Sequence, residues 1–94
     1  MINKKQIQAI LCVGKAINEI TLSKIAKRTN TTHGHCVTVV NKLEELGVVR
    51  TYRKGRCRFV FLTTKGRDVL KAVEKIWEVF YEDNQSSDSE KAGQ

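Results

Sequence analysis

Hydrophobic residues in the first half of the chain recur at helical spacing in three stretches, each opened by a residue that can cap a helix. The first stretch starts at Asn3, which stands three residues before Gln6 as in a capping box. Its apolar positions, close to a 3.6-residue period, are Ile7, Ile10, Leu11 and Ile17. The pattern predicts an N-terminal helix that buries one face.

A second and a third helix are predicted on either side of a short polar turn. Thr21 is a candidate N-cap for a helix over 22–28, directly after a short extended segment at Ile20. A longer helix over 32–46 carries one apolar stripe: Cys36, Val39, Val40, Leu43 and Leu46. Asn30 in the turn suits a left-handed backbone, and Gly47 stands where a C-cap glycine belongs.

After Gly47 the hydrophobic period changes to two. Two β-rich segments, 48–53 and 56–62, flank a turn at Lys54-Gly55. The second segment alternates, so that Arg58 shares a face with Val60 and Leu62. Thr63 can cap a last helix over 64–83. The stretch 84–94 is rich in serine and charge without a large apolar residue, so we expect a disordered acidic tail.

This order of elements predicts one small winged helix-turn-helix domain. With 94 residues the chain has room for a single domain, which we place at 1–83. The expected fold class is α+β, mostly helical, with a two- to three-stranded β-wing and a long C-terminal helix. The helix-turn-helix unit itself is expected over 22–47.

Charge is distributed unevenly along the chain. The formal net charge is +7, but residues 1–81 hold sixteen bases and six acids. Five of those bases and no acid lie between positions 50 and 58. Such a field attracts a polyanion, and nucleic acid is the commonest one in a cell. The alternative interpretation of so short a basic run is a solvated face without a partner.

Three fragments, in order, resemble the MarR family of winged-helix transcriptional regulators. Leu22 through Ala26 is similar to the family's "LT-x-x-LA" opening, residues 43–48 to the end of its recognition helix, "L-E-x-x-G-hydrophobic", and residues 62–66 to "LT-x-x-G" after the wing. Members of this family usually have longer terminal helices, so the resemblance implies a shortened form without a large effector pocket. The family's Asp-x-Arg near the wing tip is replaced here by Arg53-Lys54-Gly55-Arg56, which lacks the acid.

The resemblance and the charge together imply a sequence-selective regulator of transcription that binds double-stranded DNA, with the third helix in the major groove and the wing on the backbone or minor groove. Candidate recognition-helix contacts are Thr32, His33, His35, Val37, Thr38, Asn41 and Lys42. Candidate wing contacts are Arg50, Arg53, Lys54, Arg56 and Arg58. Candidate contacts to the DNA backbone from the second helix and the turn are Lys24, Lys27, Arg28 and Thr31. The first two turns of the recognition helix hold no arginine, so we expect modest selectivity.

The last helix carries a wider apolar stripe than one small domain needs. An exposed Trp and Phe on a helix normally mark a partner surface. We therefore expect a homodimer, with an interface made by Val73, Ile76, Trp77, Phe80 and Tyr81. A two-fold dimer would present two recognition helices to a pseudo-palindromic site.

Two other function classes stay open: an architectural protein that coats DNA with little sequence preference, and a winged helix that serves only as a protein-interaction module. An enzyme is not expected, because no paired carboxylates, nucleophile motif or phosphate loop stands out. Neither a metal nor another cofactor is expected, since the three cysteines form no CxxC and His33-x-His35 has no further ligand nearby.

Three further points concern regulation and location. Cys12 is a candidate redox sensor, although a plain buried thiol is the favoured interpretation. The sequence leaves a small-molecule effector open. No apolar run is long enough to span a bilayer and no signal-peptide pattern opens the chain, so we expect a cytoplasmic or nucleoid-associated protein with no membrane partner.

Overall fold

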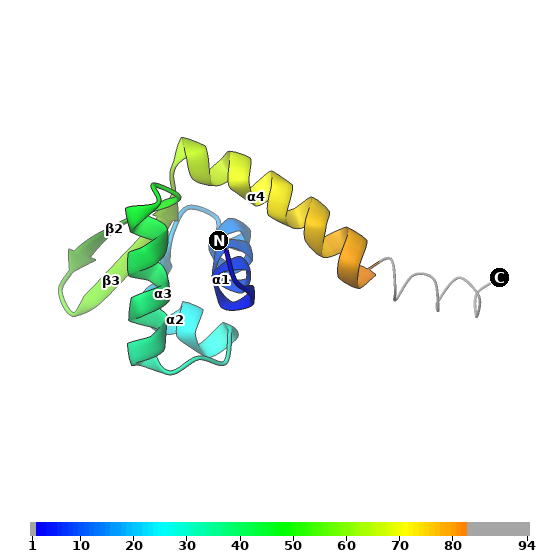
Figure 1. The fold of residues 1–94 in the computed structure, drawn as a ribbon. Helices are drawn as coiled ribbons and strands as arrows, with labels where there is room; N and C mark the ends of the chain where they lie inside the picture. The colour runs from blue at the N-terminus through cyan, green and yellow to red at the C-terminus, as the bar shows by residue number, and fades with distance from the viewer. Residues whose placement is uncertain (1, 83–94) are drawn as a thin grey trace.

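A computed structural model describes residues 2–82, which form four α-helices and a three-stranded antiparallel sheet (Figure 1). The elements, in chain order, are α1 (Lys4–Lys15), β1 (Ile20–Thr21), α2 (Leu22–Arg28), α3 (His33–Glu45), β2 (Val49–Lys54), β3 (Cys57–Leu62) and α4 (Thr64–Trp77). A π-helical turn, Glu78–Glu82, follows α4. This is the predicted winged helix-turn-helix, in which α2 and α3 form the helix-turn-helix and the β2–β3 hairpin is the wing. The predicted tail, 84–94, lies outside the described residues.

Local capping signals set the starts of the helices. Asn3 and Gln6 form the predicted capping box: each side-chain oxygen accepts a hydrogen bond of 2.9 Å from the backbone amide of the other residue. α2, α3 and α4 each begin with a threonine N-cap: Thr21, Thr32 and Thr63. The hydroxyl of each threonine accepts a hydrogen bond from the backbone amide three residues further along the chain. Each helix therefore begins where the sequence predicts.

The turns also follow local chemistry. Asn30, between α2 and α3, has φ 53°, and Gly47, after α3, has φ 78°. Gly55 at the wing tip has φ 62°, a conformation that glycine adopts without steric cost. β3 is the central strand of the sheet: Val60 pairs with Ile20 of β1 on one side, and β2 pairs with β3 along its whole length on the other.

The core lies between the three N-terminal helices and the inner face of the sheet. Its largest fully buried side chains come from α1, α2, α3, β2 and β3; they are Ile10, Ile25, Cys36, Val40, Leu43, Val49 and Val60. α4 packs along α1 and then extends away from the domain, so that the wing and the end of α4 lie at opposite ends of the molecule (Figure 1).

Three details differ from the sequence prediction. α1 ends at Lys15 because Ala16 is extended, and Ile17 beyond it is 94% exposed rather than part of the apolar stripe. Leu46 is the C-cap of α3 and is 41% exposed, since the chain turns away at Gly47. The last helix is regular only to Trp77, where the hydrogen bonding changes to the π pattern.

Two glycines allow α4 to approach the rest of the domain. A Cβ on Gly66, in the first turn of α4, would overlap the backbone carbonyl oxygen of Val48. A Cβ on Gly14 of α1 would come 2.7 Å from the methyl carbons of Leu70. The glycine in the "LT-x-x-G" fragment is therefore required by packing, not by an unusual backbone angle.

Gly66→Ala is expected to lower the free energy of unfolding by about 1–3 kcal/mol, because the overlapping carbonyl is backbone and cannot rotate away. Gly34→Ala is the matched control: its Cβ would meet no atom within 4 Å, so stability should stay the same or rise by up to about 1 kcal/mol. Urea denaturation followed by circular dichroism measures both. Equal stability of the two variants would contradict this account of the packing.

Candidate nucleic-acid interface

α3 presents a polar face to solvent along its whole length. The residues of the predicted recognition surface that are exposed are Thr32, His33, His35, Thr38, Asn41 and Lys42. Val37 differs, because it is half-buried and packs against the core, which leaves only part of its side chain for a DNA contact. The Nζ of Lys42 lies 3.7 Å from the carboxylate of Glu45, but both side chains are largely exposed, so the pair leaves Lys42 accessible.

The wing carries the other exposed cations. Arg50, Arg53, Lys54 and Arg56 are all exposed, and three of them surround the turn at Gly55. The hairpin projects beside α3 at one end of the molecule (Figure 1). Positive charge concentrated on a protruding hairpin attracts phosphate groups and releases their counterions when they bind.

Arg58 is the one predicted wing cation that turns inward. Its Nη2 donates to Oδ1 of Asn41 at 2.8 Å and to Oε1 of Glu44 at 3.1 Å, both on α3. The other carboxylate oxygen of Glu44 accepts from the backbone amide and the hydroxyl of Thr51 on β2, at 3.1 and 3.0 Å. Arg58 and Glu44 therefore hold the wing against α3.

A second contact holds the outer face of the wing. The Tyr52 hydroxyl donates to the Glu19 carboxylate at 2.6 Å, and the Tyr52 ring stacks on Phe59 with 5.2 Å between ring centroids. The hydrogen bond to Glu19, followed by burial and the negative charge of Glu19, raises the pKa of Tyr52. The sequence does not single out Glu19, Glu44 or Thr51. The alternation along β3 puts Arg58 on one face with Val60 and Leu62, but it does not show that this face is turned towards α3.

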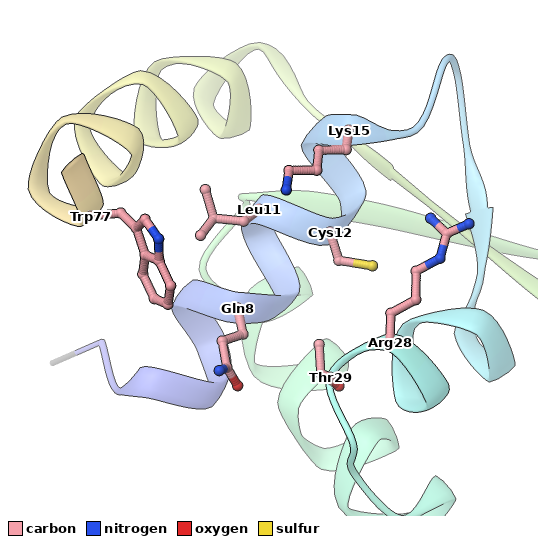
Figure 2. A pocket seen from close by; sticks show the side chains of 7 residues that line it. All are labelled: Gln8, Leu11, Cys12, Lys15, Arg28, Thr29 and Trp77. Carbon is pink, nitrogen blue, oxygen red and sulfur yellow. The ribbon is translucent and has the colours of Figure 1, made fainter. Parts of the chain in front are cut away.

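Three of the four candidates from α2 and the following turn are exposed. Lys24 and Lys27 are exposed on α2, where they can reach a phosphate. Arg28 is also exposed, and it lines a pocket next to Cys12 (Figure 2). The Thr31 hydroxyl donates to the Thr29 backbone oxygen at 3.1 Å and lies 2.8 Å from the Thr29 hydroxyl. The Thr31 hydroxyl therefore serves the turn itself, whereas Arg28, which is exposed, stays a candidate contact to the DNA backbone.

The pocket that Arg28 lines has a volume of about 220 Å³ and lies between α1, α2 and α4 (Figure 2). Its lining residues are Gln8, Leu11, Cys12, Lys15, Arg28, Thr29 and Trp77. Burial raises the pKa of the Cys12 thiol, while Arg28 and Lys15 act in the opposite direction. Because the net shift is upward, the reactive thiolate is disfavoured, which supports the interpretation of Cys12 as a plain thiol.

The last turn of α4 and the π-helical turn after it carry a group of exposed apolar side chains. Phe80 is 63% and Ile76 47% exposed, and both line a groove of about 320 Å³ together with Ile7 of α1. Trp77 is half-buried. Val73 lies in the domain's own core instead of on the expected interface, because it faces α1. The side chain of Tyr81 lies outside the described residues.

Within 2–82 no group of three or more His, Cys, Asp or Glu side chains could hold a metal ion. None of the helices described in that range is both long and apolar enough to cross a bilayer.

Comparison with known proteins shows the nearest kinds of fold. No family model matches the chain. An uncharacterized protein of Archaeoglobus fulgidus is 26% identical over 66 residues, which is 70% of each chain. FabT of Streptococcus pneumoniae, solved in complex with DNA, is 27% identical and superposes with a TM-score of 0.76 over 90% of this chain and 61% of its own. SPO1453 of Silicibacter pomeroyi DSS-3, a MarR family transcriptional regulator, is 16% identical with a TM-score of 0.78 over 92% of this chain and 62% of its own.

This chain thus spans about three fifths of the length of these two solved regulators. The superposed part includes nearly all of the described helices and the wing. By its fold the chain is a winged helix-turn-helix protein, and it resembles a shortened MarR-family transcriptional regulator.

Proposed function

We propose that this protein is a regulator of transcription that binds duplex DNA, with α3 in the major groove and the wing on the adjacent backbone. The observation that carries this proposal is the pairing of two surfaces: the polar face of α3 and the exposed cations of the wing, held side by side by Arg58 and Glu44. The likeness to FabT, which was solved in complex with DNA, supports it.

Each part of the surface has a distinct role in this proposal. Arg53, Lys54 and Arg56 neutralise phosphates, and one of the arginines enters the minor groove. Lys24 and Lys27 contact the backbone where α2 crosses the strand. The polar side chains of α3, which hold hydrogen-bonding groups, read base edges.

We further propose that the protein acts as a homodimer. The exposed apolar residues in the last turn of α4 and the π-helical turn after it are Ile76, Val79 and Phe80. If these residues pack against the same residues of a second copy, their apolar surface is removed from water and the two copies form a two-fold symmetric dimer. The two copies of α3 would then face two half-sites of a palindrome.

An architectural role is the second candidate. It is favoured by the position of the cations, which lie on the wing and α2 while the first two turns of α3 hold no Lys or Arg. A protein that binds only phosphates in this way coats DNA without strong sequence preference. Footprinting separates the two: a regulator stays on one palindrome as its concentration rises, whereas an architectural protein spreads.

The test of DNA binding is the salt dependence of the affinity for random duplex DNA, measured by fluorescence anisotropy. With about six phosphate contacts per protomer, the logarithm of the affinity should fall with a slope of about −5 per protomer against the logarithm of salt concentration. Salt-independent or absent binding would overturn the proposal and make the end of α4, with a protein partner, the functional surface.

A further inference from the structure

The side-chain amide of Asn41 has a fixed direction. Arg58 Nη2 donates to its Oδ1 at 2.8 Å. A guanidinium group offers only hydrogen-bond donors, so it must face the carbonyl oxygen of the amide and not its NH2 group. Asn41 is exposed on α3, and the group that it presents outward is therefore the NH2 donor.

The arginine that sets this direction is itself held in place. The same Nη2 donates to Glu44 Oε1 at 3.1 Å, and only 14% of the Arg58 side chain is exposed. Glu44 in turn accepts two hydrogen bonds from Thr51 on β2. Since the network involves α3, β2 and β3, rotation of the Asn41 amide would break a contact that the folded wing maintains.

We infer that Asn41, oriented by Arg58, acts as a donor-only reader of DNA bases, and that it selects bases that present an acceptor in the major groove over cytosine, without favouring adenine. This inference rests on the proposed function. An unrestrained Asn reads adenine with two hydrogen bonds, one accepted from N6 and one donated to N7. With its oxygen turned towards Arg58, Asn41 keeps only the donated bond, which O6 or N7 of guanine, N7 of adenine and O4 of thymine all accept, so the second bond that would single out adenine is lost.

Arg58 is thus a positioning residue, and the wing contributes to base selectivity without touching a base. Guanine, adenine and thymine at this position should all be preferred over cytosine by about 3- to 10-fold, the range for one net hydrogen bond, because cytosine offers only a donor in the major groove. The preference concerns one base pair in each half-site.

The inference is tested by selecting preferred duplexes from a randomised library with the wild type and four variants. Asn41→Ala should abolish the preference at one position per half-site and leave the others. Asn41→Asp replaces the NH2 donor by an acceptor and still accepts from Arg58, so its preference should reverse towards cytosine and adenine. Arg58→Met frees the amide, and adenine should become the preferred base at that position.

Arg50→Met is the matched control for Arg58→Met. It removes the same charge from the same hairpin at an exposed position that does not contact Asn41. It should weaken binding at every sequence without changing the preferred bases. Thermal unfolding checks that each variant is folded; if Arg58→Met does not fold, the reversal in Asn41→Asp carries the test.

Two outcomes would overturn the inference while leaving the proposed function intact. One is an unchanged preference at every position in Asn41→Ala. The other is the same preferred sequence for Arg58→Met and Arg50→Met. A wild type without salt-sensitive DNA binding would overturn the inference and the proposed function together, so the two failures are distinguishable.

Discussion

Replacing Arg53 and Arg56 together with alanine is expected to lower the affinity for random duplex DNA about 10- to 100-fold at moderate salt. Both side chains are exposed beside the turn at Gly55, where no acid neutralises them. Each lost phosphate contact makes the salt slope shallower by about 0.9, so the double variant should lose about 2 units of slope per protomer. Anisotropy titrations at several salt concentrations give both quantities.

Lys71→Ala with Lys75→Ala is the control for net charge. These lysines are exposed on α4, away from the wing, and their loss changes the charge of the protein by the same amount. The control should keep an affinity within about 3-fold of the wild type and an almost unchanged slope, since distant charges are screened. If both double variants lose the same affinity, the wing is not a specific DNA contact.

Phe80→Asp is expected to convert the proposed dimer into a monomer. Phe80 is 63% exposed in the single chain, and the proposed dimer covers it. In the variant, the same dimer would have to bury the carboxylate of the new aspartate without a partner of opposite charge. The dissociation constant of the dimer should rise at least about 100-fold. Affinity for a duplex with two half-sites should fall by about 10²–10⁴, because the gain from simultaneous binding is lost, while affinity for a single half-site stays the same.

Ile17→Asp is the matched control for Phe80→Asp, because it introduces the same charge at a 94% exposed isoleucine outside α4. Sedimentation velocity over a range of concentrations should show a dimer for the control and a monomer for Phe80→Asp. A wild type that sediments as a monomer at all concentrations would contradict the dimer itself.

The sequence predicts the elements of the fold well because their ends depend on local chemistry. The Asn3 capping box, the threonine N-caps, the left-handed Asn30 and the glycine after α3 each act within about four residues of their own position. The apolar stripe of α3 and the alternation along β3 add the two periods that distinguish helix from strand.

The contacts that organise the candidate site are not local, and the sequence alone does not specify them. Arg58 meets Asn41 and Glu44, which precede it by 17 and 14 residues, and Tyr52 meets Glu19 across 33. From the sequence, Arg58 is one more cation of the wing. In the folded protein it instead fixes the side chain of Asn41. Packing also explains why Val73 is buried and why Ile17 is not.

The close approach of Gly14 to Leu70 has a consequence for the spacing of DNA sites. In a dimer joined through the end of α4, the crossing of α1 and α4 sets the distance between the two copies of α3. Successive major grooves on one face of B-DNA are about 34 Å apart, and the two helices must match that repeat. In the proposed dimer, the packing of α4 against α1, of which the Gly14–Leu70 contact is one part, thus contributes to the separation of half-sites that the protein can span.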